Sequence, residues 1–128
     1  MGAERARLVV ALQSALLHAT REFGDDPRFE PHRSRVLATA AALDYVLMLA
    51  SGAAGVRIGE READRAIRDG VARGVDELIA VATSIAEIGT PAAAEFARSA
   101  AHSLSEILRE ERLERDDRRF AVIALANA

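Results

Sequence analysis

The stretch VLATAAALDYVLMLA, residues 36–50, decides the fold. Twelve of its fifteen residues are apolar, and the other three are the small Thr39, the amphipathic Tyr45 and the charged Asp44. At 100° per residue the apolar side chains fall on both sides of a helix, which leaves almost no face for water. Other helices must cover such a helix, so the sequence predicts an all-helical protein.

The apolar spacing elsewhere predicts three further helices around this one. Gly24 is expected to end the first helix, and Pro31 suits the first turn of the second. The sharpest boundary is Thr90-Pro91, where a threonine N-cap precedes a proline at the first helical position. The predicted helices span about residues 3–23, 31–51, 60–88 and 91–115.

Two glycines lie in the apolar stripe of the predicted helix over residues 60–88. Gly70 and Gly74 each cost about 1 kcal/mol relative to alanine in a helix interior. We therefore expect the backbone of another helix to approach closely at this stripe.

The C-terminal part changes polarity twice. Residues 109–119, REERLERDDRR, predict a solvated helix that continues beyond the bundle, with Glu111–Arg115 and Glu114–Arg118 pairs at i, i+4 spacing. Residues 120–128, FAVIALANA, are apolar and should fold back as a short fifth helix or strand, or pack on another subunit.

Together these patterns predict one domain over residues 1–128. The expected fold is an all-α, four-helix up-down antiparallel bundle, because four helices with short connections favour that topology. It carries a charged helical extension and a short apolar C-terminal segment.

Composition narrows the classes of function. The absence of cysteine excludes disulfides, thiolate zinc sites and cysteine nucleophiles, and fits a cytoplasmic protein. A net charge of −3, with both signs spread evenly along the chain, disfavours nucleic-acid binding. Residues 36–56 are long enough to span a membrane, but Asp44 would cost roughly 2.5–3.5 kcal/mol there, so we expect a buried helix and no membrane span.

Asp44 is the first candidate site residue. A lone carboxylate in an apolar helix should be paired or have a raised pKa, and such groups gather at functional sites. Asp44 could therefore be the buried polar anchor of a ligand pocket. The alternative is a structural role, in which Asp44 pairs with an arginine, caps a helix end or lies at a wet edge.

Two His-x3-Glu pairs raise the question of a metal site. His18 with Glu22 and His102 with Glu106 each place an imidazole and a carboxylate one turn apart. Di-iron bundles instead use inward-facing Glu-x-x-His pairs, which are absent from this sequence. His102 also lies opposite the apolar face of its helix, so we expect no metal and no other cofactor.

The same exposure gives His102 a second interpretation. The segment AAHSL around it resembles the phosphoacceptor motif of histidine phosphotransfer domains. The resemblance covers five residues and implies that His102 accepts a phosphoryl group from a receiver aspartate, with Arg98 and Arg109 screening the phosphoryl charge. Ser105 and Glu106 stand where that motif continues with lysine and glycine.

Several apolar side chains are expected on surfaces that a monomer would leave in water. Our leading hypothesis is therefore a non-enzymatic, self-associating interaction module with an adaptor, chaperone-like or regulatory role, acting as a homodimer or with a partner protein. The alternatives are a phosphocarrier using His102 and a ligand-binding bundle anchored by Asp44. The candidate interface residues are Val10, Leu17, Ile79, Phe120, Ile123 and Leu125.

Overall fold

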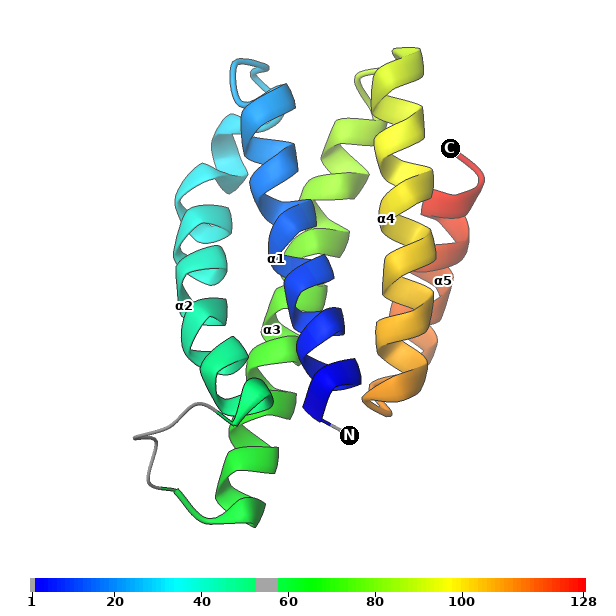
Figure 1. Ribbon diagram of the computed structural model, residues 1–128. Coiled ribbons are helices and arrows are strands. Elements are labelled where there is room, and N and C mark those ends of the chain that lie inside the picture. Colours follow the sequence, from blue (N-terminus) through cyan, green and yellow to red (C-terminus); the bar gives the residue numbers. More distant parts are fainter. Residues whose placement is uncertain (1, 53–57) are drawn as a thin grey trace.

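The computed structural model describes residues 2–52 and 58–128, and this part of the chain is all-helical, as predicted (Figure 1). It contains five α-helices and one short 3₁₀ turn, η1 (Glu30–His32), which precedes α2. The α-helices are α1 (Gly2–Phe23), α2 (Arg33–Ser51), α3 (Glu60–Ala86), α4 (Pro91–Glu110) and α5 (Asp116–Ala126).

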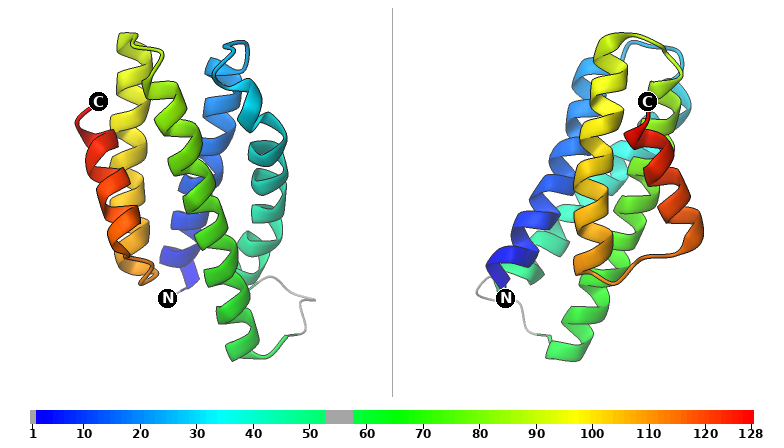
Figure 2. Two further views of the ribbon diagram at one scale, coloured as in Figure 1. Left: turned by 180° about the vertical axis from the view of Figure 1, so that it is seen from behind. Right: turned by 90° about the vertical axis from the view of Figure 1, so that its right-hand side faces the viewer.

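The helices lie side by side, and the chain reverses direction from each helix to the next (Figures 1 and 2). α1 packs against α2, α3 and α4, while α3 packs against every other α-helix. α5 lies against α3 and α4, on the far side of the molecule from α2 (Figure 2). The apolar segment 120–128 thus folds back within a fifth helix, one of the placements predicted for it, and α5 begins earlier, at Asp116 in the run expected to form a charged extension.

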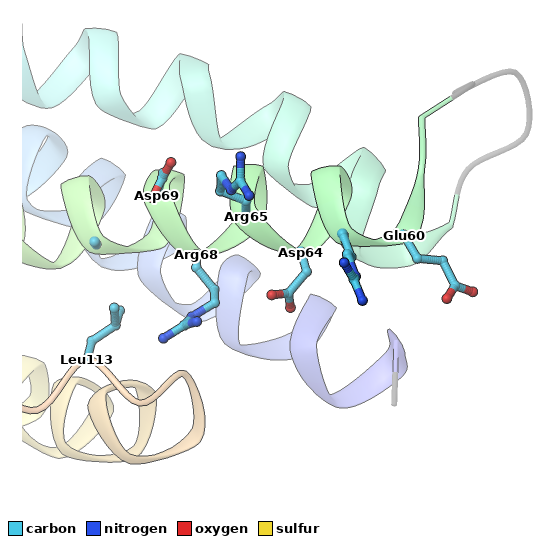
Figure 3. A pocket seen from close by; sticks show the side chains of 8 residues that line it. Glu60, Asp64, Arg65, Arg68, Asp69 and Leu113 are labelled. Atoms are coloured by element: carbon cyan, nitrogen blue, oxygen red, sulfur yellow. The ribbon is translucent and has the colours of Figure 1, made fainter.

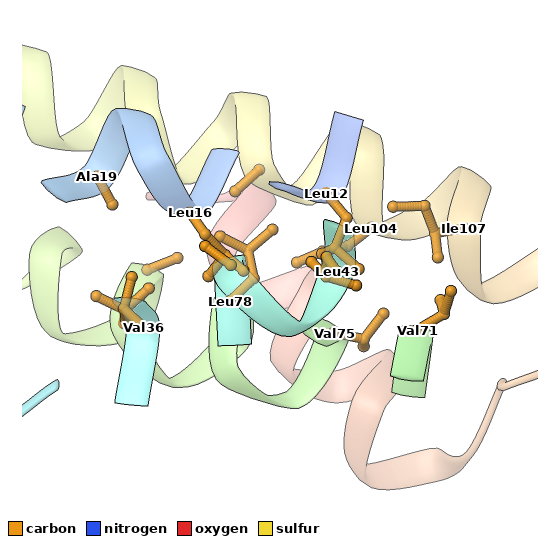
Figure 4. Close-up of a cluster of buried hydrophobic side chains, with 14 of the residues drawn as sticks. Leu12, Leu16, Ala19, Val36, Leu43, Val71, Val75, Leu78, Leu104 and Ile107 are labelled. Carbon is orange, nitrogen blue, oxygen red and sulfur yellow. The ribbon is translucent and has the colours of Figure 1, made fainter. Parts of the chain in front are cut away.

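The core is a continuous apolar cluster to which α1, α2, α3 and α4 all contribute (Figure 4). Its side chains recur at three- and four-residue spacing, as expected for helices that bury one face. The residues labelled in Figure 4 are Leu12, Leu16 and Ala19 of α1, Val36 and Leu43 of α2, Val71, Val75 and Leu78 of α3, and Leu104 and Ile107 of α4.

The two glycines of α3 do allow a close approach, but of side chains rather than of a backbone. A methyl group on Gly74 would lie 2.6 Å from Cδ2 of Leu12 in α1, and a methyl group on Gly70 would overlap Cγ2 of Val46 in α2. The expectation of backbone contact was wrong because branched side chains of the neighbouring helices fill the space that the glycines leave.

The start of α4 follows the local sequence signals. Thr90 is the N-cap, its hydroxyl accepts a hydrogen bond from the backbone N–H of Ala93, and Pro91 is the first helical residue. The adjoining boundaries are less exact, since α3 ends at Ala86, and α2 begins at Arg33 after Pro31 has entered the 3₁₀ turn.

The end of α4 contradicts the predicted helix over residues 91–115. Arg112 adopts a left-handed conformation with φ of 56°. The N–H of Leu113 donates a hydrogen bond to the carbonyl oxygen of Leu108, and the N–H of Arg112 donates one to the carbonyl oxygen of Arg109. These two bonds form a Schellman motif, in which the left-handed position is most often glycine. The helix therefore ends at Glu110, and the chain turns back into α5.

The charged run is partly buried, so the prediction of a solvated extension was wrong. Glu111 lies in the interior and accepts hydrogen bonds at 2.8 Å from Nε and Nη2 of Arg5, at the other end of the chain. Arg118 is also buried and donates to both carboxylate oxygens of Asp76 in α3, at 2.9 and 3.0 Å. These long-range pairs form in place of the expected i, i+4 pairs. One attaches Glu111, just after α4, to α1, and the other attaches Arg118 of α5 to α3.

One described segment, Glu30–Ser51, is long and apolar enough to cross a membrane by length and composition alone. The core helix of a soluble protein passes the same test. In this fold the segment packs against α1 and α3. Residues 53–56 of the stretch considered as a span lie outside the described residues, and the absence of a membrane span stays a prediction.

Candidate interaction surface

The outward side of α2 is open, although its composition predicted cover on every side. The side chains of Leu37, Tyr45 and Met48 are exposed by 44%, 52% and 45%, respectively. The small Ala38, Ala41 and Ala42 between them are exposed as well. α2 therefore presents an apolar strip that α1 and α3 leave uncovered.

α1 carries a further exposed apolar residue near the side that it turns toward α2. Nε2 of Gln13 donates to the carbonyl oxygen of Ala40 and to Oδ1 of Asp44, both at 2.7 Å, so this side of α1 faces α2. Val10 lies one helical turn from Gln13 on α1, and its side chain is 44% exposed. We call the surface formed by Val10, Leu37, Ala41, Tyr45 and Met48 the α1–α2 face.

Asp44 lies at the edge of the α1–α2 face and is exposed. The expectation of a buried polar anchor was therefore wrong, because α1 covers only one side of the carboxylate. Its hydrogen bond with Gln13 corresponds to the alternative interpretation of a structural residue at a wet edge.

The remaining candidate interface residues fall into two groups. Leu17 and Ile79 are half-buried and pack against the core, and Leu125 is a buried residue of α5. Phe120 and Ile123 of α5 are 70% and 57% exposed, respectively. Val10, Phe120 and Ile123 are thus exposed enough to contact a partner. Leu17, Ile79 and Leu125 have most of their surface covered within the chain.

His102 is exposed on α4, as its position opposite the apolar face predicted. Arg98 donates to the main-chain oxygen of Ala128 at 2.9 Å, and Arg109 lies 3.8 Å from the carboxylate of Glu110. The two arginines expected to screen a phosphoryl group thus have partners of their own. The role of His102 as a phosphoacceptor stays a prediction.

The two His-x3-Glu pairs do not form a metal centre. His18 is 2.7 Å from Glu22, and its ring stacks on Phe96 of α4 with centroids 5.8 Å apart. In the described part of the chain, no three histidine, aspartate or glutamate side chains are grouped closely enough to hold a metal ion.

An open groove of about 650 Å³ runs beside His18, between α1 and α4. Phe96 and the charged Arg21, Glu22 and Glu95 also line it. The rest of its lining consists of small side chains. These small side chains are Ala11, Ser14, Ala15, Ala92, Ser99, Ala100 and Ser103.

A second hollow lies along the first half of α3 (Figure 3). Its arginines and acidic residues alternate, and Asp64 is paired with Arg5 at 2.9 Å. Figure 3 shows Arg65 and Asp69 on one side of α3 and Asp64 and Arg68 on the other. Side chains of both signs neutralise one another there, which leaves no strong field for a charged ligand.

One close pair was missed by the sequence analysis. Nε2 of His32 is 2.7 Å from Oγ of Ser84, a residue 52 positions away on α3. Nη2 of Arg35 lies 3.5 Å from Nδ1 of the same ring. The hydrogen bond between the imidazole and the hydroxyl joins η1 to α3.

The shifted pKa values also belong to structural pairs. The Arg7 guanidinium lowers the pKa of Glu4, Arg115 lowers the pKa of Asp117, and Glu111 raises the pKa of Arg5. Each carboxylate has an arginine partner, an arrangement typical of structural ion pairs rather than of a catalytic acid or base.

Comparison with known proteins found no matching family model, no similar curated protein and no similar solved structure.

Proposed function

We propose that this protein is a non-enzymatic helical interaction module of the cytoplasm that associates with itself. Its scaffold is an up-down antiparallel bundle of α1 to α4, to which α5 is added. An adaptor, chaperone-like or regulatory role fits a protein whose surface features serve contact rather than chemistry. The observation that carries the proposal is the α1–α2 face.

The α1–α2 face is costly for a protein that stays monomeric. Its four large side chains, Val10, Leu37, Tyr45 and Met48, are each about half exposed. At roughly 25 cal/mol per Å² of apolar surface, covering such a face would stabilise an assembly by several kcal/mol before the cost of association. Contiguous exposed apolar surface of this kind marks interaction sites in soluble proteins.

The test is the mass of the purified protein in solution over a range of concentrations. Light scattering coupled to size-exclusion chromatography should give twice the monomer mass of 13.7 kDa at micromolar concentration, with dissociation on dilution. Native mass spectrometry of protein from its own cells reports any co-purifying chain or ligand at the same time. A monomer at every concentration, without a co-purifying protein, would overturn the proposal.

Phosphotransfer through His102 is the second candidate, because the imidazole is exposed in the middle of α4. Glu106, one turn further on, pairs with Arg7 at 2.6 Å, which neutralises its charge near the imidazole. A phosphorylated receiver domain should then transfer an acid-labile label to the wild-type chain and not to His102→Gln. Absence of label on the wild-type chain rejects this candidate.

A further inference from the structure

We infer that a second copy of this chain covers the α1–α2 face, with α2 of one copy crossing α2 of the other at Ala41. This inference rests on the proposed self-association and names the surface responsible. Three properties of the face support it, namely its shape, its area and its charge.

The shape of α2 suits packing against a copy of itself. Leu37, Ala41 and Tyr45 follow one another at four-residue spacing and form a ridge with a small residue at its centre. Ala38 and Ala42 form a low row beside this ridge and are also exposed. Ridges at four-residue spacing pack into the matching grooves of a second helix with axes 8–10 Å apart, and alanines allow the closer distances. A crossing at Ala41 places the large Leu37 and Tyr45 on either side of the contact.

The area of the face can be compared with that of an ordinary dimer interface. Its four large side chains are each about half exposed, and Ala38, Ala41 and Ala42 are exposed between them. With roughly 100 Å² for a fully exposed aliphatic side chain and about 200 Å² for a tyrosine, the apolar surface is on the order of 300 Å². A standard interface buries about 800 Å² per partner, of which roughly 60% is apolar, or about 480 Å². The face therefore supplies more than half of the apolar surface of one such interface.

The charge of the face favours an identical partner. In a two-fold symmetric dimer each group meets the same surface of its copy, so a charged face would repel itself. Asp44 is the one charged residue in the segment 36–50, and Oδ1 of its carboxylate already accepts a hydrogen bond from Gln13. A different protein selected by charge complementarity would find little to recognise here.

The outer face of α5 is the competing surface on this chain. It offers two exposed large side chains, Phe120 and Ile123, with the charged Asp116 and Arg119 beside them. These two side chains expose less apolar surface than the four large side chains of the α1–α2 face, and the outer face of α5 lies on the opposite side of the molecule from α2 (Figure 2). Any test must therefore distinguish these two surfaces.

Because the chain contains no cysteine, single-cysteine variants give a direct test. Disulfides form where the two α-carbons lie about 4.4–6.8 Å apart, a distance that only residues close to the two-fold axis reach. Ala41→Cys should convert to a covalent dimer under mild oxidation. Ala124→Cys on α5 and Ser99→Cys on α4, at exposed positions on other faces, should stay uncross-linked.

A charge on the face supplies the second measurement. Tyr45→Arg should raise the dimer dissociation constant by about 30-fold or more, since a buried tyrosine is a frequent centre of binding energy and the new charges repel each other. Phe120→Arg on α5 is the matched control and should leave the constant unchanged. Urea unfolding of both variants establishes that they are folded.

The outcomes separate this inference from the proposed function. A wild-type monomer would overturn this inference, and a wild-type monomer without a co-purifying protein would overturn the proposed function as well. A wild-type dimer that persists in Tyr45→Arg, fails to cross-link through Ala41→Cys or cross-links through Ala124→Cys would overturn this inference alone. A dimer that cross-links through Ala41→Cys and is weakened by Tyr45→Arg supports it.

Discussion

Replacing Glu111 with alanine should destabilise the protein far more than the same change at Glu114, although both residues belong to the same charged run. The Glu111 side chain is only 4% exposed and holds Arg5 through two hydrogen bonds of 2.8 Å. Glu114 is exposed, and the nearest nitrogen of Arg119 lies 3.7 Å away. Removing one partner of a buried pair leaves the other charge without compensation.

The magnitude follows from the surroundings of Arg5. Loss of a fully buried partner costs about 3–5 kcal/mol, but the Arg5 side chain is 24% exposed and keeps Asp64 at 2.9 Å. Water and Asp64 together should reduce the cost to about 2 kcal/mol. With a urea dependence of about 1–3 kcal/mol per molar, the unfolding midpoint should fall by about 1 M. Glu114→Ala should change the free energy of unfolding by less than about 0.5 kcal/mol.

The assay is urea unfolding followed by far-UV circular dichroism, at a protein concentration where all variants have the same oligomeric state. A double-mutant cycle with Arg5→Ala isolates the pair and should give a coupling free energy of about 1 kcal/mol or more. Equal destabilisation by Glu111→Ala and Glu114→Ala, or a coupling near zero, would show that burial of this pair contributes nothing to stability.

Three further predictions concern Arg112, Gly74 and the Glu4–Arg7 pair. Arg112→Gly should raise the free energy of unfolding by about 0.5–1 kcal/mol, because glycine adopts the left-handed conformation without the cost of a Cβ atom; a lower urea midpoint would contradict this. Gly74→Ala should lower the free energy of unfolding by about 1 kcal/mol. The overlap of the new methyl group with Leu12 costs about 1–3 kcal/mol, which outweighs the gain of about 1 kcal/mol from the higher helix propensity of alanine. A stabilised Gly74→Ala variant would mean that Leu12 moves aside freely. The pKa of Glu4 lies below its usual 4.5 because of Arg7, so this pair stabilises the folded protein above that pH and its contribution is lost as the pH falls through the lowered value. An NMR titration should find a higher Glu4 pKa in Arg7→Gln, and an unchanged value would refute the pairing.

Helix boundaries that depend on neighbouring residues could be predicted from the sequence. Boundaries that depend on tertiary contacts could not. Thr90 and Pro91 mark the start of α4 because a side-chain cap and a fixed φ act within one turn. The end of α4 has no such mark, since the left-handed residue is Arg112 and not glycine. Residues 109–119 are polar enough to continue α4 as a solvent-exposed helix. Instead, α4 ends at Glu110, and both Glu111 and Arg118 are buried.

The candidate surfaces show the same division. Val10 and Leu17 were both predicted to be interface residues, yet Val10 is exposed and Leu17 packs against the core. Ile79 was expected to be exposed and is half-buried as well. The His32–Ser84 contact had no signal at all, because residues 52 positions apart carry no shared local pattern.

Local spacing in the sequence is enough to predict that the protein is helical and where most helices lie, because helix formation depends on neighbours three and four residues apart. Which sides of α2 are covered depends instead on the packing of the other helices. Residues 36–50 are apolar nearly all round, and the position of α1 and α3 leaves the strip of Leu37, Tyr45 and Met48 in solvent. The Arg5–Glu111 pair spans 106 positions and depends on how five helices pack, which no local pattern encodes.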